Sequence, residues 1–249
     1  MSGQYVNPPI VEALCDFRFI PVEEWDATIL GLFFNEIKEQ FPNKEQEETF
    51  KFSFNPTSVG LEPKVDNLYT KMNFLNEKKN VIVQLLPDQL VVNHIKPYPG
   101  WEQFKEIILS NLEKFRKISS IKNLKRIGLR YINQINFNEP FEFEDYFKFY
   151  PQIPENLPQN YSAFKIKTDL GYPNNEFLRL DLFTKFEKDS KTIPIILDMD
   201  YYTTNPLQLD QVEEWIEAAH QRIEDAFENC LKDRMKEEFG EKLDADNNS

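Results

Sequence analysis

A two-residue alternation of apolar and polar positions opens the chain over 10–20 (IVEALCDFRFI), where Ala13, Cys15, Phe17 and Phe19 share one face. This pattern predicts a half-buried strand that Pro21 ends. The apolar period then changes to three and four residues over about 23–41, which predicts an amphipathic helix. Four more strands are expected before residue 95, the last two forming a hairpin around Pro87-Asp88. They lie near 50–54, 68–74, 81–86 and 89–94.

The remainder of the chain repeats this outline. A helix is expected after the break at Pro97, Pro99 and Gly100, with Trp101 at the start of its buried face. A long strand, a short amphipathic piece that we interpret as a helix, three strands and a final long helix follow. Their expected ranges are 125–137, 141–150, 161–170, 176–186, 193–202 and about 211–237, with Asp210 and Glu213 as a capping box.

Strands that come in consecutive runs favour antiparallel pairing over a parallel α/β fold. We therefore predict an α+β fold, with a curved antiparallel sheet, or two joined sheets, carrying long helices on one face. Both halves of the chain, about 1–120 and 121–240, end in a helix with an early tryptophan. This suggests an internal duplication of a helix-on-sheet unit within one compact domain spanning 1–240, followed by a flexible polar tail at 241–249.

The charge balance limits the classes of partner. A net charge of −13 argues against direct nucleic-acid binding, which normally requires clustered Lys and Arg. Neither a signal peptide nor an apolar run long enough to span a membrane occurs, so a cytoplasmic location is expected. Cys15 and Cys230 are isolated from each other in sequence and read as buried, reduced thiols.

Five segments, spread over almost the whole chain, together resemble an uncharacterised family of sporadically distributed bacterial proteins. They are PPIVEALCDFRF (8–19), VVNHIKPYPGW (91–101), RIGLRYINQI (126–135), DYFKFYP (145–151) and EEWIEAAHQRIEDAFENCLKDRM (213–235). The resemblance implies no established activity. The scattered distribution of that family implies a mobile or defence-associated role and another bacterial protein as the partner.

The corner at 93–101 is the first candidate site. We predict that Asn93, His94, Tyr98 and Trp101 are held together, with Trp101 buried and His94 partly accessible to solvent, because rigid corners often carry binding residues. The alternative is that these residues serve corner packing alone. His220, between Glu217 and Glu224 on a helix, is interpreted as a solvated ion-pairing residue.

Charged residues on the expected strands give two weaker candidates. Arg126 and Arg130 share the polar face of their strand and could bind an anion, although pairing with acids such as Asp16 or Asp181 is the default interpretation. Asp198 and Asp200 share another strand face and, together with Asp181, could hold a metal ion. A solvated acidic face is favoured over that site, and no cofactor is expected.

Three functions remain open at this point. The favoured one is a non-catalytic bacterial interaction module that binds and regulates a partner protein, in a defence or toxin-regulating system. The second is a metal-dependent hydrolase or nuclease that uses Asp181, Asp198 and Asp200. The third is a small-ligand sensor with a cavity between helix and sheet. An interaction module of the first kind would not be an enzyme. The sequence specifies neither its partner nor its oligomeric state.

Overall fold

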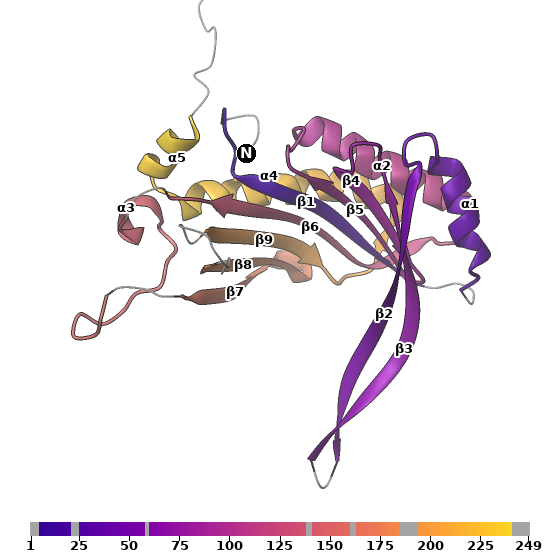
Figure 1. Ribbon diagram of the computed structural model, residues 1–249, viewed down its shortest axis with the longest axis horizontal. Helices are drawn as coiled ribbons and strands as arrows, with labels where there is room; N and C mark the ends of the chain where they lie inside the picture. Colours follow the sequence, from indigo (N-terminus) through magenta and orange to yellow (C-terminus); the bar gives the residue numbers. More distant parts are fainter. Residues whose placement is uncertain are drawn as a thin grey trace, which may run out of the picture.

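The structure is a computed structural model that describes residues 5–20, 25–57, 60–137, 141–159, 163–184 and 194–240. The tail predicted at 241–249 lies outside these residues. Within them, ten strands form one open antiparallel sheet, which confirms the predicted α+β class (Figure 1). The strands are β1 (Ile10–Phe19), β2 (Asn43–Thr57), β3 (Gly60–Leu75), β4 (Val81–Leu86), β5 (Gln89–Ile95), β6 (Asn123–Ile135), β7 (Lys165–Tyr172), β8 (Glu176–Thr184), β9 (Ile195–Thr203) and β10 (Leu207–Gln208).

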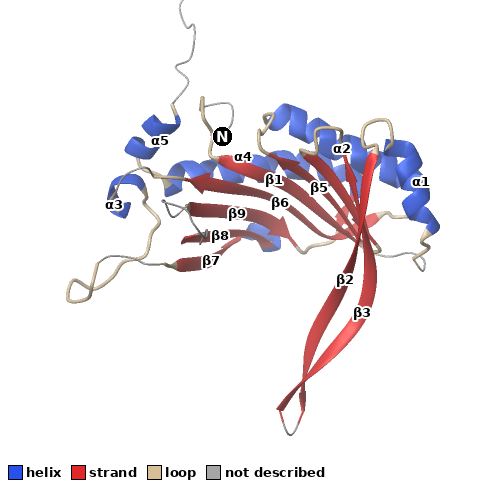
Figure 2. Cartoon of the chain, in the orientation of Figure 1, coloured by secondary structure: helices blue, strands red, loops and turns tan. Residues whose placement is uncertain are grey.

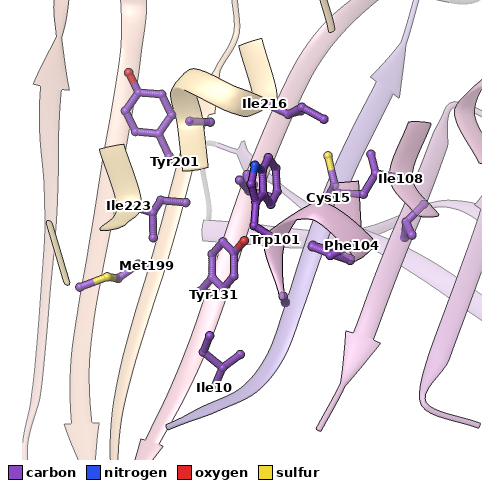
Figure 3. Packing of buried hydrophobic residues seen from close by; sticks show 14 of the residues in the cluster. Ile10, Cys15, Trp101, Phe104, Ile108, Tyr131, Met199, Tyr201, Ile216 and Ile223 are labelled. Atoms are coloured by element: carbon purple, nitrogen blue, oxygen red, sulfur yellow. The ribbon is translucent and has the colours of Figure 1, made fainter. Parts of the chain in front are cut away.

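The helices cover one face of this sheet, as predicted (Figure 2). They are α1 (Thr28–Ile37), α2 (Trp101–Ile118) and α4 (Val212–Cys230), with α3 (Phe143–Tyr146) and α5 (Asp233–Phe239) at one end. Alternate residues of the strands point into the helix layer because side chains on a strand alternate between faces. Both cysteines are free and buried, as expected. Figure 3 shows Trp101 and Phe104 of α2 together with Tyr131 of β6 inside this core.

The order of the strands is β2-β3-β4-β5-β1-β6-β9-β8-β7, with β10 beside β6. In each half the first strand pairs with the last one, β1 with β5 and β6 with β9, and the intervening strands follow outward. The two halves meet where β1 pairs with β6. The halves therefore share the order of their main strands. Among the described residues they differ in that β2 flanks β3 whereas no strand flanks β7, and in that the short β10 pairs with β6. The β2–β3 ribbon also extends well beyond the rest of the sheet (Figure 1).

The last predicted helix differs from the structure in two respects. The continuous helix expected over 211–237 is wrong, since α4 ends at Cys230 and α5 begins at Asp233. Between them Leu231 is extended and forms a β-bridge with Phe147, which draws its backbone out of the helix. The capping box is also misplaced: Gln208 and Gln211 form it in a short 3₁₀ turn ahead of α4.

Candidate functional site

A cleft of about 870 Å³ opens at the end of the sheet where β1 begins and β6 ends, and we call it the strand-end cleft. Its walls come from the segment before β1, the loop after β5, the end of β6, the α3 region and α5. The lining residues are Val6, Asn7, Pro8, Pro9, Ile10, Lys96, Pro97, Tyr98, Gln134, Ile135, Asn136, Phe137, Phe141, Tyr146, Arg234, Met235, Glu238 and Phe239.

All five segments singled out in the sequence contribute to this cleft. Pro9, Tyr98, Gln134, Tyr146 and Met235 each come from a different one of them. Segments that are far apart in the chain therefore meet at one place on the surface. Of the four residues predicted to be held together at the corner, only Tyr98 lines the cleft, beside its neighbours Lys96 and Pro97.

The α3 side of the cleft is aromatic and partly cationic. The rings of Phe137 and Phe141 stack with centroids 3.5 Å apart, and Tyr146 packs edge-on against Phe137 at 5.0 Å. Arg234 lies 4.6 Å from the Tyr146 ring centroid and forms an ion pair with Asp145, with 2.7 Å between Nη1 and Oδ2. This wall can bury an apolar group and places a guanidinium at its edge.

The opposite side of the cleft is held by backbone hydrogen bonds. The backbone N–H of Val6 donates to Gly240 at 2.8 Å, and that of Asn7 donates to Phe239 at 2.9 Å. The backbone N–H of Gln134 donates to Pro9 at 2.9 Å. These bonds fix the segment before β1 against α5 and β6, so the cleft is built before any ligand arrives.

A buried polar chain runs from Tyr98 into the core. The hydroxyl groups of Tyr98 and Tyr131 are 2.9 Å apart, and the Tyr131 hydroxyl is 3.1 Å from Nδ1 of His220. Nε2 of His220 is 3.4 Å from Oε1 of Glu224. Trp101 covers this histidine, with the two rings stacked at 4.1 Å. The chain thus connects a cleft residue to helix α4 through the middle of the core.

The protonation of this chain follows from its burial. Desolvation lowers the pKa of His220 to about 4, so the imidazole is neutral at neutral pH. Desolvation also raises the pKa of Tyr98 and of Tyr131, so both hydroxyls keep their protons. A neutral imidazole carries one ring proton, so one nitrogen of His220 can donate and the other can accept. The hydroxyls of Tyr98 and Tyr131 can each donate or accept in this chain.

The predicted corner is not one cluster. His94 is 4% exposed and lies on the helix-covered side of β5, so the predicted solvent access of its side chain is wrong. Its ring contacts Tyr98 and Phe104 edge-on, and Nδ1 is 2.8 Å from the Ile95 carbonyl. Asn93 lies on the opposite face, because neighbouring residues of a strand alternate. Trp101 is buried, as predicted, but it contacts His220 instead of Tyr98.

The second set of predicted residues meets on the helix-free face of the sheet. Arg126 binds both Asp16 and Asp200, the latter with 3.0 Å between Nη2 and Oδ2. Arg130 donates to both carboxylate oxygens of Asp198 through Nε and Nη2, with 2.7 Å between Nε and Oδ1. Their default interpretation, ion pairing with acids such as Asp16, is therefore confirmed for Arg126, while Arg130 pairs with an acid not foreseen for it.

The acidic candidates lie beside these arginines. Asp181 pairs in register with Asp198 on adjoining strands, so the three acids do share a face. Asp198 and Asp200 hold arginines, and burial raises the pKa of Asp200 while Arg126 lowers it. In the part of the chain that the structure describes, no group of three or more His, Cys, Asp or Glu is arranged to hold a metal ion.

Sequence reasoning missed His220 and Tyr131 as partners of Tyr98. His220 is buried, because Trp101 covers the ring that its acidic neighbours suggested was solvated. The burial of His220 could have been predicted from the spacing of the apolar residues around it, because this spacing places His220 at the border of the buried stripe of the helix. These residues are Trp215, Ile216, Ala219 and Ile223. No signal along the chain gives the distance between His220 and Tyr131.

Comparisons with protein-family models and with curated proteins find no match for this chain. Among the described residues, no helix is long and apolar enough to cross a membrane. The site must therefore be interpreted from its own geometry.

Proposed function

We propose that this chain is a non-catalytic interaction module that binds and regulates a partner protein, and that the strand-end cleft receives a segment of that partner. The observation that carries the proposal is the convergence of five distant segments on one prebuilt cleft of about 870 Å³. As the family resemblance implies, the partner is another bacterial protein, in a defence or toxin-regulating system.

The chemistry of the walls supports this occupant. The Phe137–Phe141 stack offers apolar surface for one side chain of the partner. Asn7, Gln134 and Asn136 line the same cleft and can bond to the amides of a peptide backbone. The hydroxyl of Tyr98 is already hydrogen-bonded to that of Tyr131, and the raised pKa of Tyr98 disfavours a role in proton transfer.

The test is recovery of the native complex with tagged chain from its host. The double variant Val6→Asp/Lys96→Glu alters two cleft residues, and Val6 is 62% exposed, so folding is expected to survive. We expect wild type to retain one stoichiometric partner protein and this variant to weaken its binding at least 10-fold. The matched control is Leu32→Asp/Lys38→Glu on exposed positions of α1 and its C-cap, which should bind like wild type.

Two results would contradict the proposal. One is a chain that purifies from its host without any partner. The other is a partner whose affinity is the same for both double variants, at matched melting temperatures, because the cleft would then play no part.

A small-ligand sensor is the second candidate, since a volume of about 870 Å³ lies within the usual range for ligand pockets of roughly 300–1,000 Å³. Native mass spectrometry of chain isolated from its host would separate the two. A retained compound of a few hundred daltons, lost in Val6→Asp/Lys96→Glu, favours the sensor.

A further inference from the structure

Strand β7 forms the outer edge of the second half of the sheet. Its register partners are residues of β8, and no other described segment pairs with it. The matching strand of the first half, β3, is flanked by β2 along its whole length. The backbone N–H and C=O groups on the outer side of β7 are therefore available to another strand.

The helix-covered side of β7 has an apolar groove beside this edge. Leu170 is 42% exposed, although it lies in register with the buried Leu178. It lines a hollow of about 340 Å³ together with Tyr172 and with Ala226 of α4. Exposed apolar surface next to an open edge is what the side chains of an added strand would cover.

The helix-free side of β7 carries a surplus of positive charge. Lys165 and Lys167 occupy alternate positions and are both exposed, and Lys165 approaches Asp181 only to 3.8 Å. No ion pair of Lys167 occurs among the described residues. Asp169, the next residue on this side, is already paired with Arg179, with 2.7 Å between its Oδ1 and Nε.

We propose that the outer edge of β7 binds an extended segment of a partner protein in which apolar and acidic residues alternate. Such a segment would add a strand at the place that β2 takes in the first half. Because side chains of a strand alternate, its apolar residues would enter the groove at Leu170 while its acids face Lys165 and Lys167. Lysines at an edge also disfavour uncharged strands, which makes this edge selective.

The test uses a fluorescein-labelled eight-residue peptide of alternating valine and aspartate, with fluorescence anisotropy as the readout. Two control peptides are used. The first has four valines followed by four aspartates, and the second alternates valine with lysine. We expect the alternating acidic peptide to bind at least 10-fold more tightly than either. Hydrogen exchange should slow within 165–172 when it binds.

Variants on each side of β7 assign the contacts. Leu170→Asp should weaken binding of the acidic peptide at least 10-fold, and Lys167→Glu should shift the preference towards the lysine peptide. The matched controls are Leu157→Asp, on an exposed loop leucine, and Lys117→Glu, at the end of α2; both should bind like wild type.

Three outcomes would overturn the inference. They are equal binding of the alternating and block peptides, binding that Leu170→Asp and Lys167→Glu leave unchanged, and a homodimer that Leu170→Asp dissociates, since a second copy would then occupy the edge. None of these outcomes depends on the variants of the strand-end cleft, so this inference and the proposed function can be contradicted separately.

Discussion

Each half of the molecule has a tryptophan at the start of its long helix, and the two tryptophans contact different parts of the protein. Trp101 begins α2 and Trp215 lies in the first turn of α4. The indole N–H of Trp215 donates to Glu176 at 2.9 Å, within its own half. That of Trp101 donates to Glu217 at 3.1 Å, and its ring stacks on His220, both on α4. The first half is thus anchored on the helix of the second.

This difference indicates that α4 joins the halves on the helix side, as the β1–β6 pairing does within the sheet. Lys105 of α2 strengthens the junction by bonding to Glu217 at 2.9 Å. At the junction Trp101 and His220 are buried while Glu217 lies at the surface, whereas Trp215 belongs to a local cluster with Tyr201. Substitutions at matched positions should therefore separate local stability from coupling between the halves.

The largest effect is expected at the tryptophans. Trp101→Ala and Trp215→Ala should each lower the free energy of unfolding by about 3–5 kcal/mol, because each removes a large buried ring. Urea denaturation measures this. Only Trp101→Ala should also raise the pKa of His220 towards 6.5, since it uncovers the imidazole, and an NMR titration would detect the change. Equal pKa shifts in both variants would contradict the assigned junction.

A pH dependence comes next in size. The unfolded chain protonates His220 near pH 6.5, but the folded chain does so only near pH 4. The folded state therefore loses stability as the pH falls from 6.5 to 4, by up to about 3 kcal/mol. The charged groups around it are Glu217 and Glu224 on its own helix and Lys105 on α2.

Urea denaturation across this pH range should show the slope, and His220→Gln should remove most of it. His94, the histidine of the first half, has a pKa that burial also lowers, so His94→Gln serves as the matched control. If the slope survives in His220→Gln and disappears in His94→Gln, the burial of His220 behind Trp101 is not its source.

The smallest effect compares two strand glycines. A Cβ on Gly128 of β6 would lie 2.9 Å from Nη1 of Arg126 and 3.1 Å from Oδ1 of Asp200, which hold each other in place. Gly128→Ala should therefore cost about 1 kcal/mol. Gly171→Ala on β7 meets nothing within 4 Å and should change stability by less than about 0.5 kcal/mol. Equal changes in melting temperature for the two variants would contradict this prediction, because Arg126 would then move away from the added methyl group at no cost.

The sequence predicts the elements with strong local periods. The strand at 81–86 is found at these residues because its short apolar run, VIVQLL, ends where Pro87-Asp88 turns the chain. The break between α4 and α5 escaped prediction because Leu231 and Met235 continue the apolar stripe of the helix. What interrupts it is a bridge to Phe147, a contact that no local period encodes.

The site is predictable to a smaller extent. Tyr98 and Trp101 stood out because prolines flank them, and Trp101 is buried as predicted. The cleft and the Tyr98–Tyr131–His220 chain depend on the register between β1 and β6 and on the placement of α4 over them. Such distances arise from tertiary packing and leave no trace in the spacing of residues along the chain.

The position of β1 has a consequence for how the protein is made. This strand is synthesised before the other described strands, yet Cys15 pairs with Val92 on one side and with Leu129 on the other. At synthesis rates of about 5–20 residues per second, β1 waits roughly 6–23 s before both neighbours, β5 and β6, are complete. During that time its alternating apolar face, including Phe17 and Phe19, has no native cover. Among the described strands, the central strand of the finished sheet is therefore the one that stays without both native neighbours for longest during synthesis.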